Sequence, residues 1–151
     1  MKNLSLVAFS LLASVQLSAA GLLDDLVGKW TLNRTEPGVR ITTVFKRVGN
    51  RGLRADSKTI VPGLGTAIGV TNYNANGTVR GNVKRDGAVV TTLTGTWRIS
   101  GNKLIEEVVL SSPLFGEADQ KTTVTLVNPN KLGTVNILDG NRTTGTLSRN
   151  R

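Results

Sequence analysis

Short stretches in which hydrophobic and polar residues alternate recur along most of this chain, and turn-forming residues separate them. In residues 78–84, for example, Val79, Gly81 and Val83 occupy alternate positions, and the residues between them are polar. Successive side chains of a β-strand point to opposite faces, so this alternation places one apolar face against one polar face. The pattern predicts half-buried antiparallel strands.

The turn signals are spaced as in an up-and-down sheet, and Asp86-Gly87 is the strongest of them because a two-residue hairpin turn needs positive φ. Residues 88–100 fit either two strands or one long strand bent at Gly95. The sequence therefore predicts an all-β fold, a small antiparallel up-and-down β-barrel. The expected strands are Lys29–Thr35, Val39–Val48, Leu53–Val61, Ala67–Tyr73, Thr78–Arg85, Ala88–Thr94, Gly95–Ser100, Lys103–Ser111, Lys121–Asn128, Leu132–Leu138 and Thr143–Arg149.

Two stretches interrupt this rhythm, residues 61–69 and residues 112–119, and both are rich in Pro and Gly. We expect them to be irregular loops at the rim of the barrel. Their apolar residues Leu64, Leu114 and Phe115 fit two roles: a lid over a cavity, or ordinary connections that cap the core.

The chain has 151 residues, enough for one domain with its own core, and its 17 glycines and 4% aromatic residues favour strands and turns. Residues 1–20 have the features of a cleaved signal peptide: Lys2, an apolar run, and small residues before Gly21. The apolar run is too short for a transmembrane segment. We therefore expect a signal peptide at 1–20, a barrel domain at 21–151, and a periplasmic or secreted protein.

The residue types limit the chemistry of the protein. The chain has no His and no Cys, so the Ser-His-Asp and Cys-His arrangements and the usual zinc sites cannot form. Glu106 and Glu107 are the adjacent carboxylates inside an expected strand, and neighbours in a strand point to opposite faces. We expect a non-enzymatic protein with no catalytic residues, no metal and no cofactor.

Three short motifs give the chain a resemblance to lipocalin-like proteins of bacteria. They are Gly28-Lys29-Trp30, the segment 95–104 that follows the turn at residues 76–78, and the basic end of the last strand at 146–149. The resemblance implies a barrel that holds a small apolar ligand. It also implies that Gly28 and Trp30 close one barrel end together with Arg149, which packs against the indole.

Ligand-binding candidates follow from strand alternation and size. The large side chains best placed to face an interior are those of Trp97, Tyr73 and Phe45, and a small apolar or amphipathic molecule is the expected ligand. A second hypothesis is an interaction module of the protease-inhibitor-like barrel type, although such barrels usually carry a disulfide.

A third hypothesis comes from charge, because 19 basic and 10 acidic residues give a net charge of +9. Lys46, Arg47, Arg51 and Arg54 gather around one expected hairpin, which favours an anionic lipid or glycan as a partner. Apart from Phe45 there are no aromatic residues among them, so nucleic acid is an unlikely partner. A basic face kept for solubility explains the same residues.

Overall fold

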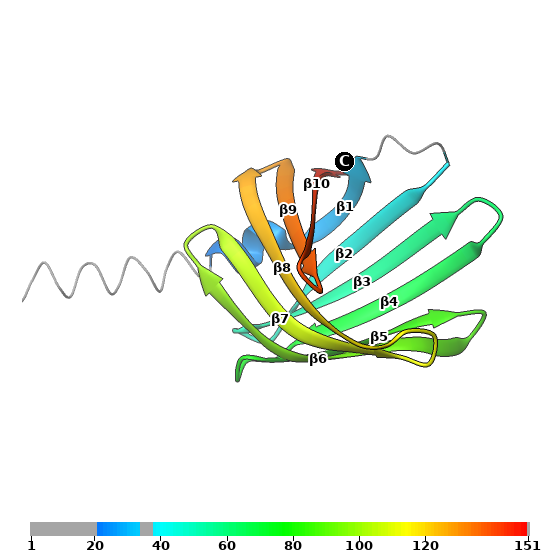
Figure 1. Cartoon of the computed structure of the whole chain (residues 1–151). Helices are drawn as coiled ribbons and strands as arrows, with labels where there is room; N and C mark the ends of the chain where they lie inside the picture. The colour runs from blue at the N-terminus through cyan, green and yellow to red at the C-terminus, as the bar shows by residue number, and fades with distance from the viewer. Residues whose placement is uncertain (1–20, 34–37, 151) are drawn as a thin grey trace, which may run out of the picture.

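The computed structural model describes residues 21–33 and 38–150, and their strands form one closed antiparallel barrel (Figure 1). Each strand pairs with its neighbours in the chain, and β1 pairs with β10. The predicted all-β up-and-down barrel is confirmed, whereas the predicted signal peptide lies outside the described residues. The strands are β1 (Gly28–Asn33), β2 (Arg40–Val48), β3 (Gly52–Val61), β4 (Gly65–Tyr73), β5 (Thr78–Arg85), β6 (Ala88–Ser100), β7 (Lys103–Ser112), β8 (Gly116–Asn128), β9 (Lys131–Leu138) and β10 (Asn141–Arg149).

The two stretches expected as irregular loops are mostly strand, so that prediction was wrong. β4 already begins at Gly65 and β8 at Gly116, which leaves three-residue turns at 62–64 and 113–115. Gly63, Gly65 and Gly116 adopt positive φ values of 77°, 88° and 78°. These glycines therefore make tight turns, and do not break the strands as their density in the sequence suggested.

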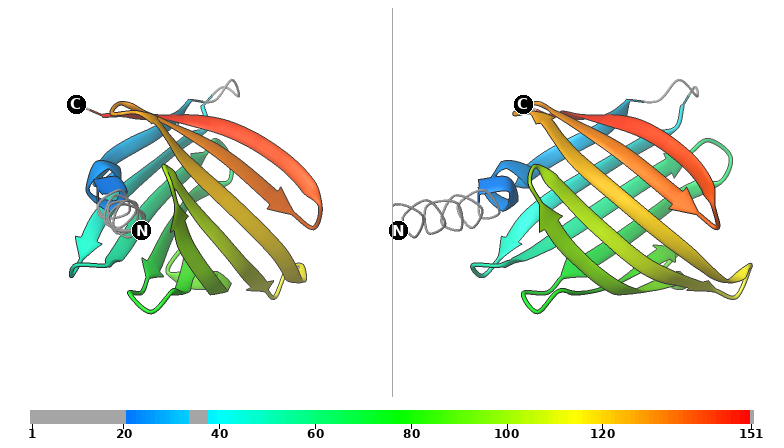
Figure 2. Two further views of the ribbon diagram at one scale, coloured as in Figure 1. Left: turned by 90° about the vertical axis from the view of Figure 1, so that its left-hand side faces the viewer. Right: turned by 60° about the vertical axis from the view of Figure 1, so that its left-hand side comes forward.

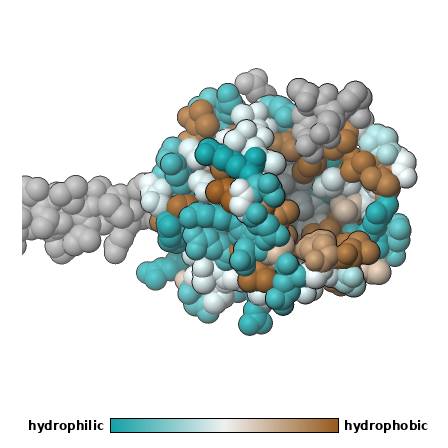
Figure 3. All heavy atoms as spheres, viewed as in Figure 1, coloured by the Kyte–Doolittle hydropathy of each residue, from teal (hydrophilic) through white to brown (hydrophobic). Residues whose placement is uncertain are grey.

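The apolar residues at these turns do not cap the core. Leu64, Leu114 and Phe115 are 60%, 84% and 55% exposed, so they project into solvent. Figure 3 shows hydrophobic residues among hydrophilic ones on the right-hand side of the molecule. The core-capping role considered from the sequence is therefore wrong, and the role as a lid stays a prediction.

Residues 88–100 form one strand, β6, which confirms one long strand in place of two; the strand register shows no irregularity at Gly95. A Cβ atom at Gly95 would collide with the carbonyl oxygen of Glu107 on β7. The glycine therefore lets the two strands approach closely at this point. The shift of register lies elsewhere, between Val83 and Lys84 where β5 meets β6.

The two ends of the barrel differ. A short helix at residues 21–26 precedes β1 and lies at one end, which we call the closed end (Figure 2). Its residues Leu22, Leu23 and Leu26 are buried and belong to the main hydrophobic cluster. In an up-and-down barrel the turns alternate between ends, so the β3–β4 and β7–β8 turns lie at the opposite, open end.

Trp30 and Arg149 join the first strand, the last strand and the helix at the closed end. The two residues are directly paired between β1 and β10, and the Arg149 Cζ lies 4.2 Å from the centroid of the Trp30 ring. The Trp30 Nε1–H donates to the Leu26 carbonyl at 2.8 Å, and Arg149 Nη1 donates to the Val27 carbonyl at 2.7 Å. A Cβ at Gly28 would lie 2.6 Å from Arg149 Nη1, so only glycine leaves room for this guanidinium.

Replacing Arg149 with Ala is expected to lower the free energy of unfolding by about 1–3 kcal/mol, because the cation–π contact and several carbonyl partners are lost together. Urea denaturation measures this change. Arg142→Ala is the matched control, because Arg142 is an exposed arginine on the same strand. An unchanged unfolding midpoint for Arg149→Ala would contradict the role given to this contact.

Candidate functional site

The inward-facing side chains differ in size and burial between the two ends of the barrel. In antiparallel pairing, directly opposite residues share a face, so the buried residues identify which positions point inward. Near the closed end these positions hold large buried side chains such as Leu53, Val79, Leu104 and Leu132. This half of the barrel is packed by its own residues.

Towards the open end many inward positions are small or polar, and most, including the apolar Ile41 and Leu93, are only half-buried. The row that contains buried Phe45 continues through Ala55, Thr71 and Gly81 to Leu93. A ten-strand barrel is wider than one that its side chains just fill, and the half-buried state of most of these inward residues shows that solvent reaches part of its interior. We call the space they line the lumen; its walls include Ile41, Thr43, Ser57, Thr71, Gly81, Thr91, Leu93 and Asn136.

The three ligand-binding residues expected from the sequence all point inward and lie where the packed half meets the lumen. Phe45, Tyr73 and Trp97 are 6%, 8% and 9% exposed and belong to one hydrophobic cluster. The Tyr73 and Trp97 rings meet edge to face, with centroids 5.5 Å apart, and the Trp97 Nε1–H donates to the Asn74 carbonyl at 2.8 Å. The structure therefore buries these three aromatic rings on the closed-end side of the lumen, and we call them the floor of the lumen.

Glu106 lies beside this floor and was missed as a site residue. It is 5% exposed, stands opposite Trp97 in the strand register, and accepts a 2.8 Å hydrogen bond from the Tyr73 hydroxyl. Burial raises the pKa of the Glu106 carboxyl, although hydrogen bonds from Tyr73 and Gln120 act in the opposite direction. The pKa of Tyr73 is raised well above its usual range by burial and by the Glu106 charge.

Three polar residues connect Glu106 with the lumen. The register aligns Glu106 with Thr122 and Asn136 on the next two strands. Gln120 Nε2 donates to Thr122 Oγ1, and that hydroxyl donates to Asn136 Oδ1, both at 3.1 Å. All three are half-buried. Together with Tyr73 and Glu106 they form what we call the polar cluster.

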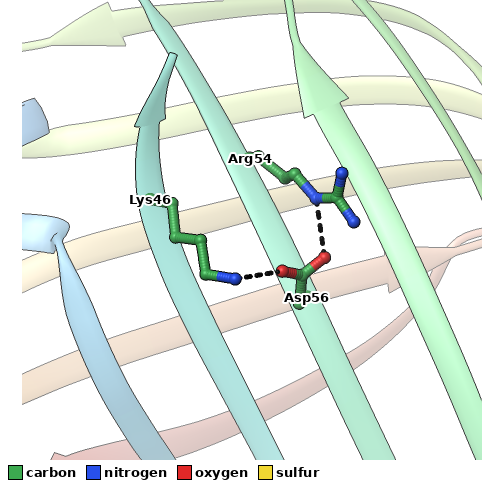
Figure 4. A network of polar contacts seen from close by, with 3 residues as sticks. All are labelled: Lys46, Arg54 and Asp56. Atoms are coloured by element: carbon green, nitrogen blue, oxygen red, sulfur yellow. Dashed lines mark hydrogen bonds and ion pairs between the residues drawn. The ribbon is translucent and has the colours of Figure 1, made fainter.

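The candidate basic surface is partly neutralised by carboxylates. Asp56 lies between Lys46 and Arg54, with Lys46 Nζ 3.0 Å from Oδ2 and Arg54 Nε 2.8 Å from Oδ1 (Figure 4). These contacts lower the Asp56 pKa, Arg54 contributing most. Arg47 points inward, and its Nε lies 3.3 Å from Asp24 of the helix. Arg51 is exposed at the β2–β3 turn.

Among residues 21–33 and 38–150, no three His, Cys, Asp or Glu residues lie together in a group that could hold a metal ion. Nor does this part of the chain contain a helix long and apolar enough to cross a membrane.

The sequence matches no protein-family model, and no curated protein shows significant similarity to it. Among solved structures, the fold is similar to the crystal structure of Rv2717c from M. tuberculosis, with a TM-score of 0.52. The match covers 88% of this chain and 98% of that chain at 16% sequence identity. Similarity at this level of identity supports the barrel fold alone.

Glu106 gives the stability of the protein a characteristic pH dependence. Its folded-state pKa is raised, so the stability it contributes is present below its unfolded pKa and is lost as pH rises through the folded pKa. As pH rises from the unfolded-state pKa of Glu106 through its folded-state pKa, the wild-type protein should therefore lose stability relative to Glu106→Gln. Urea denaturation at a series of pH values measures this change. Glu107→Gln should show the opposite trend, because Lys121 lowers the Glu107 pKa. Parallel pH profiles for wild type and Glu106→Gln would contradict this account.

Asp56→Asn tests the outer ion pairs. The Asp56 pKa is lowered, so its stabilising contribution is present above its unfolded pKa and is lost as pH falls through the folded pKa. Since the cations are largely exposed, the expected loss at neutral pH is about 0.5 kcal/mol and shrinks in high salt. A loss that is equal at acidic and neutral pH would show that charge is not its cause.

Proposed function

We propose that this protein is an exported, non-enzymatic, lipocalin-like barrel that binds a small apolar or amphipathic ligand in its lumen. The observation that supports this most strongly is the division of the interior into a packed half and a half with small, partly exposed walls. A barrel that served only as a rigid scaffold would gain stability by filling both halves with apolar side chains.

The chemistry of the walls suggests how a ligand would lie. An apolar chain would contact Ile41 and Leu93 on the walls and the aromatic floor, and each Å² of apolar surface removed from water contributes about 25 cal/mol. A polar group at the inner end of the same ligand would meet the polar cluster. This combination favours an amphipathic molecule.

Export and lack of catalysis are parts of the same proposal. Export is supported by the sequence of residues 1–20, and the lipocalin-like assignment by the short motifs around Trp30, Trp97 and Arg149. Lipocalin barrels have fewer strands than this one, which gives the present barrel the wider interior. Catalysis by a carboxylate pair is disfavoured because Glu106 points inward and Glu107 outward.

The alternative of an anionic partner at the β2–β3 hairpin has weaker support. Lys46 and Arg54 share Asp56, and Arg47 is paired with Asp24. These carboxylates reduce the positive potential that would hold an anionic surface. We therefore place the ligand inside the barrel.

A variant that fills the lumen tests this function. Thr71→Phe puts a ring next to Ala55 and Gly81, whereas Thr92→Phe makes the same change at an exposed outward position. A brominated long-chain alcohol should quench the fluorescence of wild-type protein and of Thr92→Phe saturably and with little salt dependence. Thr71→Phe should weaken this binding about tenfold or more, since the ring occupies the ligand's space. No saturable quenching, or equal binding by both variants, would contradict the function.

A further inference from the structure

We propose that the ligand in the lumen carries a positively charged amino group, which pairs with the carboxylate of Glu106. This inference rests on the proposed function and makes it more specific, because it selects cationic amphiphiles over fatty acids. It follows from the burial of Glu106 and from the neutral groups that contact its carboxylate.

The Glu106 carboxylate is buried, and within the described part of the chain the ion pairs of Lys and Arg reach Asp24, Asp56 and Glu107 but not Glu106. The groups that contact Glu106 are neutral, the Tyr73 hydroxyl and the Gln120 amide. An ionised carboxylate in such surroundings is costly unless a positive charge comes to it.

The described arginines at inward-facing positions make their contacts away from Glu106. Arg47 pairs with Asp24, and Arg149 donates to the carbonyl oxygens of Val27 and Pro129 at the closed end. Arg85, near the open end, donates to the carbonyl oxygen of Leu64. None of these described arginines reaches Glu106, so the cation that we infer for it comes from the lumen.

An alkylammonium group fits this position in several respects. It brings three N–H donors, and the oxygens of Thr122 and Asn136 lie in register with the Glu106 carboxylate as further acceptors. The rings of Tyr73 and Trp97 beside it are electron-rich partners for a cation. A ligand carboxylate would instead meet a like charge there, and none of the described basic side chains contacts Glu106 to offset it.

The pairing also makes binding depend on pH in a defined direction. The side chains facing Glu106 are those of Tyr73 on β4, Trp97 on β6, and Gln120 and Thr122 on β8, and Asn136 on β9 lies beyond them. Of these only Tyr73 titrates, and it stays protonated because its pKa is raised. Affinity for an amine should therefore rise as Glu106 loses its proton and then level off.

The decisive experiment compares three ligands with the same alkyl chain: dodecylamine, dodecanol and dodecanoate, each below its micellar concentration. Calorimetric or fluorescence titration should show the amine binding at least about tenfold more tightly than the alcohol, and the alcohol more tightly than the carboxylate. Glu106→Gln should remove the preference for the amine and keep binding of the alcohol. Glu107→Gln removes the same charge from the neighbouring outward position and should leave the preference intact.

The outcomes separate this inference from the function on which it rests. If the alcohol binds and the amine is no tighter, or if Glu107→Gln reduces the preference as much as Glu106→Gln, the inference is wrong and the carrier function stands. Tighter binding of dodecanoate than of dodecylamine also overturns it. If none of the three binds, both proposals fail. Should Glu106→Gln not fold, the wild-type affinity for dodecylamine relative to dodecanol must still rise between about pH 4 and about pH 8, and a flat ratio overturns the inference.

Discussion

The contact between the Arg149 guanidinium and the Trp30 indole is the constraint on which the rest of the barrel depends. It joins the last strand to the first, and the same guanidinium holds the chain at Val27, where the helix ends. The helix is thereby kept over one end of the barrel, with Leu22, Leu23 and Leu26 in the core. Because this end is closed by protein, a molecule entering the lumen must come through the other.

The buried carboxylate of Glu106 lies at the boundary between the two halves of the interior. Large buried apolar side chains fill the closed half, mostly half-buried side chains line the open half, and Tyr73 donates to Glu106. Tyr73 reaches Glu106 across two strands, β5 and β6, whose nearby inward positions include Gly81 and Gly95. Burying a carboxylate here costs stability, and a cost of this kind is typical of sites that serve binding more than folding.

Much of the fold could be predicted from alternation and turn chemistry. The pattern gave the up-and-down barrel, and Asp86 and Gly87 do form a turn with φ values of 50° and 79°. The loops at 61–69 and 112–119 were mispredicted because a high density of Pro and Gly does not distinguish a tight turn from a long connection. In the alternating pattern of its strand, Glu106 falls on the same face as the apolar residues Leu104 and Val108, and this position indicated that its side chain is buried. Its meeting with Tyr73, 33 residues away, depends on the closure of the barrel and could not be predicted from local pattern.

The central claim is that a ligand occupies the open half of the barrel, and nuclear Overhauser effects from a bound alkyl chain test it most directly. With dodecanol bound, we predict contacts from its methylene protons to the methyl groups of Leu93, Thr71 and Ile41, which face inward. Val109 on the outer surface, 40% exposed, should show none. Contacts to Val109 without contacts to Leu93 and Thr71 would place the ligand outside the barrel and contradict the account.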